Sequence, residues 1–246
     1  MRLYLSKSEF IETSEAIDLS MSLQASTENV RAWYVDPPRM ETVRANGFTG
    51  SIKEGGSVNF RDVFFNPHGH GTHTECCGHI TQEVYAVNDV LKEFFYHATL
   101  VTVDPVQLEN GDLVVQAAQI APFLNKDFSE ALLIRTLPNG LDKKSMNYSG
   151  TNPCYLDIEI VDLLNEYGVK HLLVDQPSVD REEDGGALAF HHAFWNVPEK
   201  PNFERTITEL IYVPNDVADG NYILEIQMAA FHNDASPSRP VLYQIQ

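Results

Sequence analysis

The sequence predicts an α/β domain, because patterns typical of a helix and of buried strands follow one another in its second half. Residues 156–167, LDIEIVDLLNEY, repeat apolar side chains at spacings of three and four, which is typical of an amphipathic helix. Gly168 follows at once, as glycine does at many helix ends. Residues 170–175, KHLLVD, then read as a short buried strand.

The earlier part of the chain supplies strand candidates. Residues 16–23, AIDLSMSL, alternate apolar and polar side chains and predict a first strand. A long irregular excursion follows over residues 32–56, and residues 57–65 predict the strand that leads into a histidine-rich segment. The remaining predicted elements are a short helix at 88–95, strands at 98–103 and 131–136 with a turn at 110–112 between them, and strands at 206–213 and 221–230.

The composition is that of an ordinary globular protein. The chain has 246 residues, of which 43% are hydrophobic and 10% aromatic, so we expect one domain over residues 1–246. Seventeen Lys and Arg face 35 Asp and Glu, which gives a net charge of −18. Such a charge argues against nucleic acid and anionic membrane surfaces as partners and leaves a small molecule as the expected one.

The amino terminus and the cysteines favour a cytoplasmic location. The opening residues lack an apolar signal-peptide region, and no stretch approaches the roughly 18 apolar residues of a membrane span. The three cysteines cannot make a disulfide framework and are expected to be reduced and buried; they are Cys76, Cys77 and Cys154.

Residues 66–80, NPHGHGTHTECCGHI, hold the strongest chemical signal. The stretch contains no Lys or Arg, and its potential ligands are His68, His70, His73, Glu75 and His79. Imidazole and carboxylate together suit zinc or manganese, and the interspersed glycines allow the backbone bends that bring side chains to one point. Helical spacing is absent, which excludes the HExxH type of zinc site.

The orientation of these side chains depends on the backbone. If the segment is extended, His73 and Glu75 share one face, because side chains alternate along a strand. His68 and His70 then point to the opposite face, unless a glycine supports a bulge. Both therefore stay candidate ligands on sequence grounds.

Four segments in one order, residues 17–20, 71–79, 173–180 and 234–241, resemble the cyclase family of metal-dependent hydrolases. That family includes bacterial kynurenine formamidases and isatin hydrolases. The resemblance implies a single α/β domain with a mixed, partly barrel-like sheet and flanking helices, in a homo-oligomer. It also implies metal-dependent hydrolysis of a C–N bond in a small amide or formamide, with N-formylkynurenine the substrate most suggested.

The family signature, His-x-Gly-Thr-His-x-Asp-x-Pro-x-His, is altered in this chain. Residues 71–73 match its Gly-Thr-His, which puts Gly69 at the first histidine and Glu75 at the aspartate. Cys77 replaces the proline, and His79 matches the last histidine. One metal ligand is therefore missing from its usual place.

The resemblance further implies a histidine and a glutamate from the second half as ligands of a second metal. His191 and Glu209 match these best, with His192 as the alternative to His191. Glu209 lies inside an apolar strand, where an unpaired carboxylate is costly, so it should meet a metal or a cation.

These residues suggest a division of roles. A divalent metal, with zinc favoured and manganese the alternative, would be held at His73 and Glu75, where it would polarise a carbonyl and lower the pKa of water to ~7. Glu75 could bridge two such ions. His79, past the bend at Gly78, is expected to carry the proton from water to the leaving amine, which is worth roughly 10²–10⁴ in rate.

Three polar residues follow the strand at 170–175, at the end where α/β proteins tend to bind ligands. Asp175, Ser178 and Asp180 are expected to orient metal ligands or to line the mouth of the site. Two rival functions remain, namely a hydrolase of another cyclic amide or lactone, and a member that lost its metal and only binds a small ligand. Gly69, which stands where the family has a metal-ligating histidine, keeps the ligand-binding alternative open.

Overall fold

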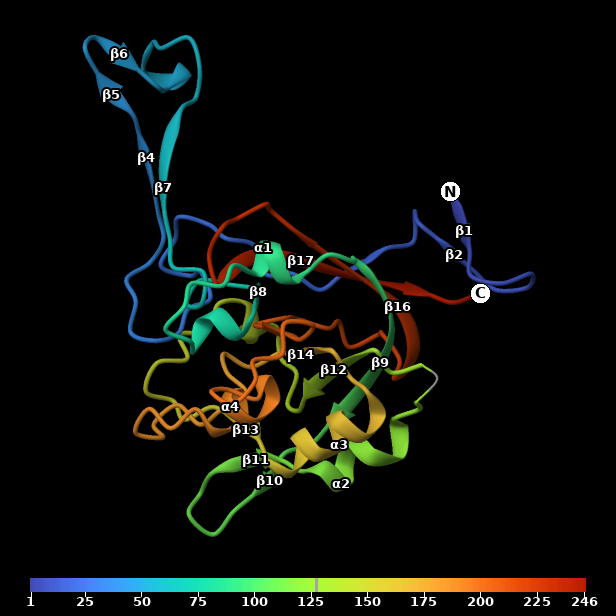
Figure 1. Cartoon of the computed structure of the whole chain (residues 1–246). Helices are drawn as coiled ribbons and strands as arrows, with labels where there is room; N and C mark the ends of the chain where they lie inside the picture. Colours follow the sequence, from blue (N-terminus) through green and yellow to red (C-terminus); the bar gives the residue numbers. More distant parts are fainter. Residues whose placement is uncertain (127) are drawn as a thin grey trace.

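The computed structural model describes residues 1–126 and 128–246, and a closed, mixed β-barrel dominates the fold. Within these residues, seven strands form a ring in the order β16-β9-β12-β14-β15-β8-β17, which the pairing of β16 with β17 closes (Figure 1). β9, β12, β14 and β15 run parallel to one another, and the remaining pairs are antiparallel. The expected partly barrel-like sheet is therefore confirmed.

The bounds of the elements are as follows. The ring strands are β8 (His73–Glu75), β9 (Phe95–Val103), β12 (Ala131–Thr136), β14 (His171–Val174), β15 (Thr206–Glu209), β16 (Gly220–Met228) and β17 (Ala235–Gln244). The other strands are β1 (Arg2–Tyr4), β2 (Phe10–Glu12), β3 (Ile17–Asp18), β4 (Arg39–Thr42), β5 (Arg44–Ala45), β6 (Phe48–Thr49), β7 (Arg61–Phe64), β10 (Val106–Gln107), β11 (Leu113–Val115) and β13 (Tyr155–Leu156). The helices are α1 (Val87–Val90), α2 (Ala117–Ile120), α3 (Glu159–Tyr167) and α4 (Ala189–Trp195), with 3-10 turns η1 (Ile52–Glu54), η2 (Cys77–His79), η3 (Ala121–Phe123) and η4 (Leu141–Lys144).

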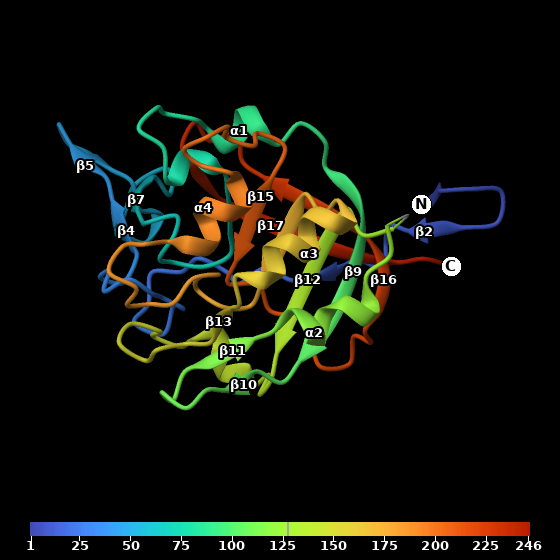
Figure 2. The ribbon, with the colours of Figure 1, turned by 60° about the horizontal axis from the view of Figure 1, so that its bottom comes forward.

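The parallel strands are apolar on both faces because each face packs against a different core. Along β12, Leu133 joins the barrel interior, whereas Leu132 and Ile134 join the core under the helices. Figure 2 shows α2 and α3 lying over this side of the sheet. Burial on both faces explains why these strands read as continuous apolar runs rather than as alternating ones.

Several predicted elements are confirmed. β12 has the predicted bounds, the helix at 156–167 forms as α3, and Gly168 ends it with a left-handed φ of 74°. The strand predicted at 206–213 stops at Glu209, because Leu210 takes a φ of 54° that turns the chain out of the sheet. The first predicted strand shrinks to β3, and β17 has no counterpart among the predictions.

The excursion at residues 32–56 was predicted as irregular, and this was wrong for its second part. Residues 39–65, here called the arm, form the antiparallel ribbon of β4 and β7 with a folded tip that contains β5 and β6. Figure 1 shows the arm extending away from the body of the molecule. The turn at its tip uses Asn46 and Gly47, both with positive φ, which is typical of a tight hairpin.

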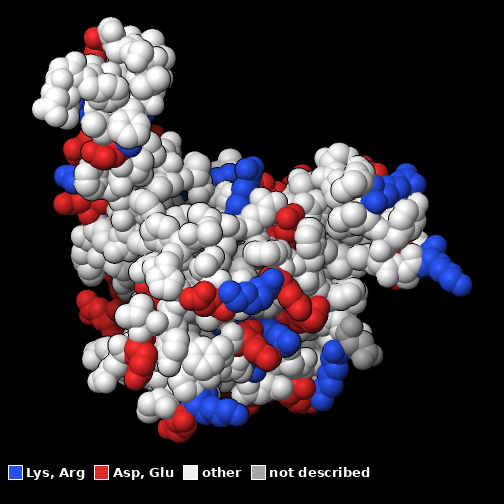
Figure 3. All heavy atoms as spheres, turned by 45° about the horizontal axis from the view of Figure 1, so that its top comes forward, with Lys and Arg blue, Asp and Glu red and all other residues white. Residues whose placement is uncertain are grey.

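Charge is divided unequally between the arm and the body. The arm carries four basic and three acidic residues, which leaves 13 basic and 32 acidic residues for the rest of the chain. Figure 3 shows an arm that is mostly uncharged beside a body with scattered acidic groups. Among the helices described, none has both the length and the apolar character needed to cross a membrane.

His171 gives the fold a pH dependence. Burial, with a smaller effect of the charge on Lys170, lowers the pKa of His171 to about 3, and its Nδ1 lies 2.8 Å from Thr206 Oγ1. Between about pH 6.5 and pH 3, His171 therefore binds a proton in the unfolded chain but not in the folded protein. His171 therefore does not lower the stability of the fold above about pH 6.5, and it lowers that stability increasingly as the pH falls below this value.

We expect His171→Gln, which keeps a polar partner for Thr206 but does not titrate, to lose less stability in acid than the wild type. At about pH 5 the titration of His171 should cost the wild type roughly 2 kcal/mol relative to neutral pH. Urea unfolding of both proteins across this range measures the difference. Parallel stability curves would contradict the assignment.

Candidate metal centre

The register between β8 and β15 brings the first candidate ligands together. His73 pairs with Glu209 across the two strands, and Glu75 lies two residues farther along β8, on the same face. His73 Nε2 is 3.4 Å from Glu209 Oε2, and one potential ligand atom from each of the three residues lies within 4.8 Å of the others. All three side chains are buried.

Two atoms of this group lack the partners that buried polar atoms normally have. His73 Nδ1 lies 2.9 Å from the carbonyl oxygen of Gly71, which can only accept, so Nδ1 carries the hydrogen and Nε2 offers a lone pair. His73 Nε2 and Glu75 Oε2 are buried without a hydrogen bond among the described residues. Because unpaired buried polar atoms are costly, and because imidazole nitrogen and carboxylate oxygen are suitable ligands, the group fits a divalent metal.

α4 delivers His191 to the same place. His191 Nε2 lies 3.2 Å from Glu75 Oε1, and His191 Nδ1 lies 2.6 Å from Asp180 Oδ2. Asp180 also accepts the backbone N–H groups of Phe190 and His191, so one carboxylate fixes both the start of α4 and the ring. His192 instead directs its Nδ1 to the carbonyl oxygen of Val197, at 3.1 Å, and lies outside this group.

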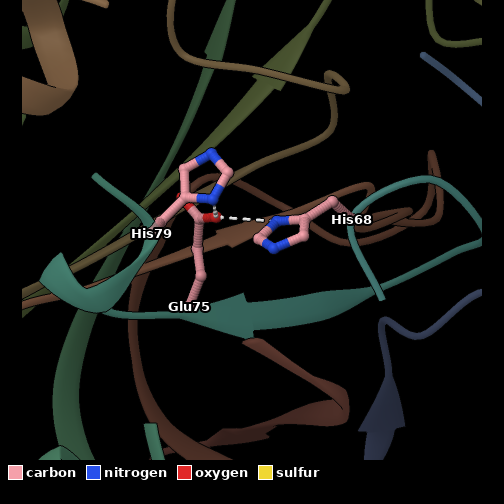
Figure 4. A group of neighbouring side chains, drawn as sticks. All are labelled: His68, Glu75 and His79. Carbon is pink, nitrogen blue, oxygen red and sulfur yellow. Dashed lines mark ion pairs between the residues drawn. The ribbon is translucent and has the colours of Figure 1, made fainter. Parts of the chain in front are cut away.

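A second group shares Glu75 with the first (Figure 4). His68 Nδ1 lies 3.0 Å and His79 Nδ1 lies 3.9 Å from Glu75 Oε2. Asp234, just before β17, also contacts both rings, with Oδ2 at 2.8 Å from His68 Nε2 and 3.3 Å from His79 Nδ1. Glu75 is thus placed so that it could contact two ions.

We expected His68 to point away from His73 and Glu75 if the segment were a regular strand. The backbone before His73 is not a strand. Residues 66–72 form turns and bends, and Gly71 has a φ of 140°. A side chain at Gly69 would not fit, since its Cβ would lie 2.8 Å from Val35 Cγ2 and 3.2 Å from the carbonyl oxygen of Ala32. A histidine at position 69 would therefore require Val35 and the neighbouring backbone to shift, and in this structure His68 turns inward instead.

His70 lies apart from both groups. Its Nε2 donates to the carbonyl oxygen of Asp36 at 2.7 Å, and its Nδ1 accepts the backbone N–H of Asn66 at 2.7 Å. Both ring nitrogens therefore hold the loop together, and neither is free for a metal.

The charges of the site are strongly coupled. Burial lowers the pKa of His68 and His191, but neighbouring carboxylates outweigh it and raise the pKa of each to about 10. These carboxylates are Asp234 and Glu75 for His68, and mainly Asp180 and Glu75 for His191. Metal ligands must be deprotonated, so an ion that binds here has to displace these protons.

The two groups open into a cavity of about 240 Å³. Its lining residues are Trp33, Asn66, His68, His79, Ser178, Leu188, His191 and Glu209. Trp33, Asn66 and Leu188 were not singled out as site residues from the sequence. Asp234 was missed as well, although it lies in one of the four segments that resemble the family.

The three polar residues expected after β14 separate into different roles. Ser178 lines the cavity, and its Oγ accepts the backbone N–H of Asp180 at 3.0 Å. Asp175 lies outside the cavity and pairs with Lys143 Nζ at 2.8 Å in a buried network with Thr136. The structure thus brings Ser178 and Asp180 to the site but not Asp175.

Comparison with known proteins identifies the family. The family model described as "Putative cyclase" matches residues 17–181, which is more than half of the chain. This chain belongs to the cyclase family. A kynurenine formamidase from Bacillus cereus is 30% identical over 237 residues, covering 96% of this chain and 100% of the relative. A kynurenine formamidase from Bacillus anthracis is 29% identical over 237 residues, with the same coverage.

Solved structures share the cyclase fold. Isatin hydrolase A from Labrenzia aggregata, bound to benzyl benzoate, matches with a TM-score of 0.65 and 14% identity, covering 93% of each chain. An isatin hydrolase bound to thioisatinate matches with a TM-score of 0.66 and 12% identity, covering 94% of this chain and 93% of that one. The resemblance drawn from the sequence is therefore confirmed at the level of family and fold.

We expect His68→Ala to weaken metal binding by roughly 100-fold or more, because it removes a group that contacts Glu75 directly. His70→Ala is the matched control and should keep its metal. Elemental analysis and competition with a coloured chelator measure both variants. Equal losses in the two variants would contradict the placement of His68.

Proposed function

We propose that this cyclase-family member is a metal-dependent hydrolase that cleaves the C–N bond of a small amide or formamide, with an aryl formamide such as N-formylkynurenine as its substrate. One observation carries the proposal, namely that His73, Glu75, His191 and Glu209 form one buried cluster in which His73 Nε2 and Glu75 Oε2 make no hydrogen bond among the described residues. The relatives named kynurenine formamidase, similar over almost the whole chain, support the substrate class.

His73, Glu75, His191 and Glu209 would hold the metal, with His68 within reach of Glu75. Zinc is proposed, and manganese is the alternative, since both accept nitrogen and oxygen ligands. When bound, such an ion supplies Lewis-acid polarisation of the substrate carbonyl.

Residues of the chain orient the histidine rings around that centre, and one of them would transfer a proton. The carbonyl of Gly71 and the carboxylate of Asp180 hold the rings of His73 and His191 so that each directs Nε2 inward. His79 lines the cavity and is partly exposed, with Nδ1 beside Asp234. This leaves Nε2 of His79 for passing a proton to the leaving amine.

The cavity suits a substrate of about one aromatic ring. Trp33 and Leu188 are the apolar residues of its lining, and the polar residues of the lining would orient the reacting carbonyl. A cyclic amide or a lactone of similar size is the alternative substrate. The inward position of His68 favours a hydrolase over a member that lost its metal.

The remaining expectations belong to this proposal. We propose one hydrolase domain over residues 1–246 and a cytoplasmic location, where free thiols such as Cys76, Cys77 and Cys154 remain reduced. We also propose a homo-oligomer, and the arm supports it.

The arm is a ribbon that leaves too much apolar surface in water. All four residues of β7 are exposed, and Val63 and Phe64, which point to opposite faces, are 48% and 44% exposed. An isolated two-stranded ribbon is marginally stable in water, so this one should be covered by a partner. A second copy fits best, because the weakly basic arm would meet an acidic body.

The catalytic prediction contrasts two histidines. His79→Ala should keep its metal and lose roughly 10²–10⁴ of kcat on N-formylkynurenine, whereas His73→Ala should lose metal and activity together. Metal analysis and steady-state rates of both variants measure this. A rate that is indifferent to His79 would refute its role. A metal-free wild type inactive on formamides, cyclic amides and lactones would favour the ligand-binding alternative.

The arm prediction concerns oligomeric state. The double variant Phe60→Asp/Val63→Asp should raise the dimer dissociation constant at least about 100-fold, because charges would enter an apolar contact. Phe123→Asp/Val84→Asp alters two exposed apolar residues outside the arm and should leave the dimer intact. Light scattering and sedimentation measure both. A monomeric wild type at micromolar concentration, or an arm variant that stays dimeric, would contradict this interface.

A further inference from the structure

A second cavity, of about 460 Å³, lies at the carboxyl ends of β12 and β14 and shares no lining residue with the metal cavity. Thr136 ends β12 and Gln176 follows β14, and both line it. Ligands commonly bind at this edge of parallel strands, and the volume lies within the range of small-molecule sites. Nothing in the proposed hydrolysis uses this cavity.

Two polar groups of the cavity have unused hydrogen-bonding capacity. Tyr148 is 3% exposed, and its hydroxyl has no hydrogen-bond partner among the described residues. The Gln176 amide nitrogen donates to Thr136 Oγ1 at 2.6 Å, while within the described part of the chain the amide oxygen accepts no hydrogen bond. These two side chains thus offer one donor and one acceptor.

Tyr148 lines this cavity, and its buried hydroxyl stays protonated. Burial raises the pKa of Tyr148, and the nearby carboxylates of Asp175 and Asp142 raise it further. Burial likewise raises the pKa of Cys154 to about 12, so its thiol is neutral. Neither group presents a charge to an occupant at neutral pH.

The cation of the cavity is already fully engaged. Lys143 Nζ donates to Asp175 Oδ2 at 2.8 Å, to the carbonyl oxygen of Thr136 at 2.8 Å and to Thr136 Oγ1 at 3.1 Å. An ammonium group has three donors, so none remains for an anion. Asp142 at the rim would repel an anion as well.

Most of the remaining wall is apolar, with Leu113, Leu137, Met146 and three prolines, and Thr151 and Asn152 add two polar side chains to it. We propose that this cavity is a second ligand site, for an uncharged amide on a small apolar or aromatic body. The amide carbonyl accepts from Tyr148, the amide N–H donates to Gln176, and the apolar body lies against Met146 and Leu137. A carboxylate of the same shape is excluded because it lacks the donor and meets no free cation.

The site stands beside the metal centre without being part of it. The backbone carbonyl of Gln176 accepts the N–H of Leu210 at 3.0 Å, and Val179 donates its N–H to Glu209 Oε1 at 3.2 Å. An occupant held by Gln176 therefore contacts the segment that supports Glu209. Occupancy itself is independent of the metal and of catalysis.

Binding can be observed at a methionine. The protein has five methionines, of which Met146 lines this cavity, so ¹³C labelling of the methionine methyl groups gives one reporter inside it and four outside. Benzamide is the probe and benzoate its charged match. Benzamide should shift the Met146 signal, identified with Met146→Leu, in a saturable manner, and benzoate at the same concentration should not.

Two variants locate the site. Tyr148→Phe should weaken benzamide binding about 3–10-fold, the value of one neutral hydrogen bond. It should leave the melting temperature of the free protein unchanged or raise it, because the hydroxyl it removes has no partner. His73→Ala, which alters the metal centre alone, should leave the shift of Met146 intact.

Three results would overturn the proposal. These are a Met146 signal that benzamide does not move, equal binding of benzoate, and benzamide affinity unchanged in Tyr148→Phe. Loss of the shift in His73→Ala would instead assign the bound probe to the metal cavity and would overturn the proposal too. None of these readouts requires turnover, so a failure here is distinct from a failure of the proposed hydrolase.

Discussion

The buried carboxylate of Glu75 is the constraint on which the arrangement of this protein depends. Its side chain is 1% exposed, and an uncompensated charge at such a depth costs several kcal/mol. Burial raises the pKa of Glu75, but His79, His191 and His68 lower it far more, so the group stays ionised. These partners come from three different segments, namely the loop before β8, η2 and α4. All three segments must therefore be in place around β8 before Glu75 is satisfied.

The buried histidines are compensated in the same way, by carboxylates that lie farther from the centre of the cluster. His191 and His68 each direct one ring nitrogen to Glu75 and the other to a more distant carboxylate, Asp180 at 2.6 Å and Asp234 at 2.8 Å. With both nitrogens engaged, neither ring can rotate without losing a charged contact. Carboxylates outside the candidate ligand set thus determine where the candidate ligand atoms point, which is why the carboxyl-terminal segment matters to a site whose motif lies near residue 75.

Features that depend on neighbours along the chain were predictable from sequence, and features that depend on tertiary contacts were not. The helix that Gly168 ends follows from local spacing, and the shared face of His73 and Glu75 follows from strand alternation. The inward turn of His68 does not, because it requires the packing of Gly69 against a distant segment. β17 was missed because its two prolines weaken the strand pattern, yet its pairing partners tolerate them at these positions.

Backbone strain gathers around the same cavity. Trp33, Leu188 and Leu210 all have positive φ, at 60°, 43° and 54°, although none is a glycine. Such conformations cost on the order of 1–3 kcal/mol each and persist only where the surroundings hold them. His73 Nε2 and Glu75 Oε2, which are buried without a hydrogen bond among the described residues, add to the local cost of the candidate metal centre. An ion that binds only the folded chain adds its binding free energy to folding, so the group expected to polarise the substrate also offsets the strain of the site that holds it.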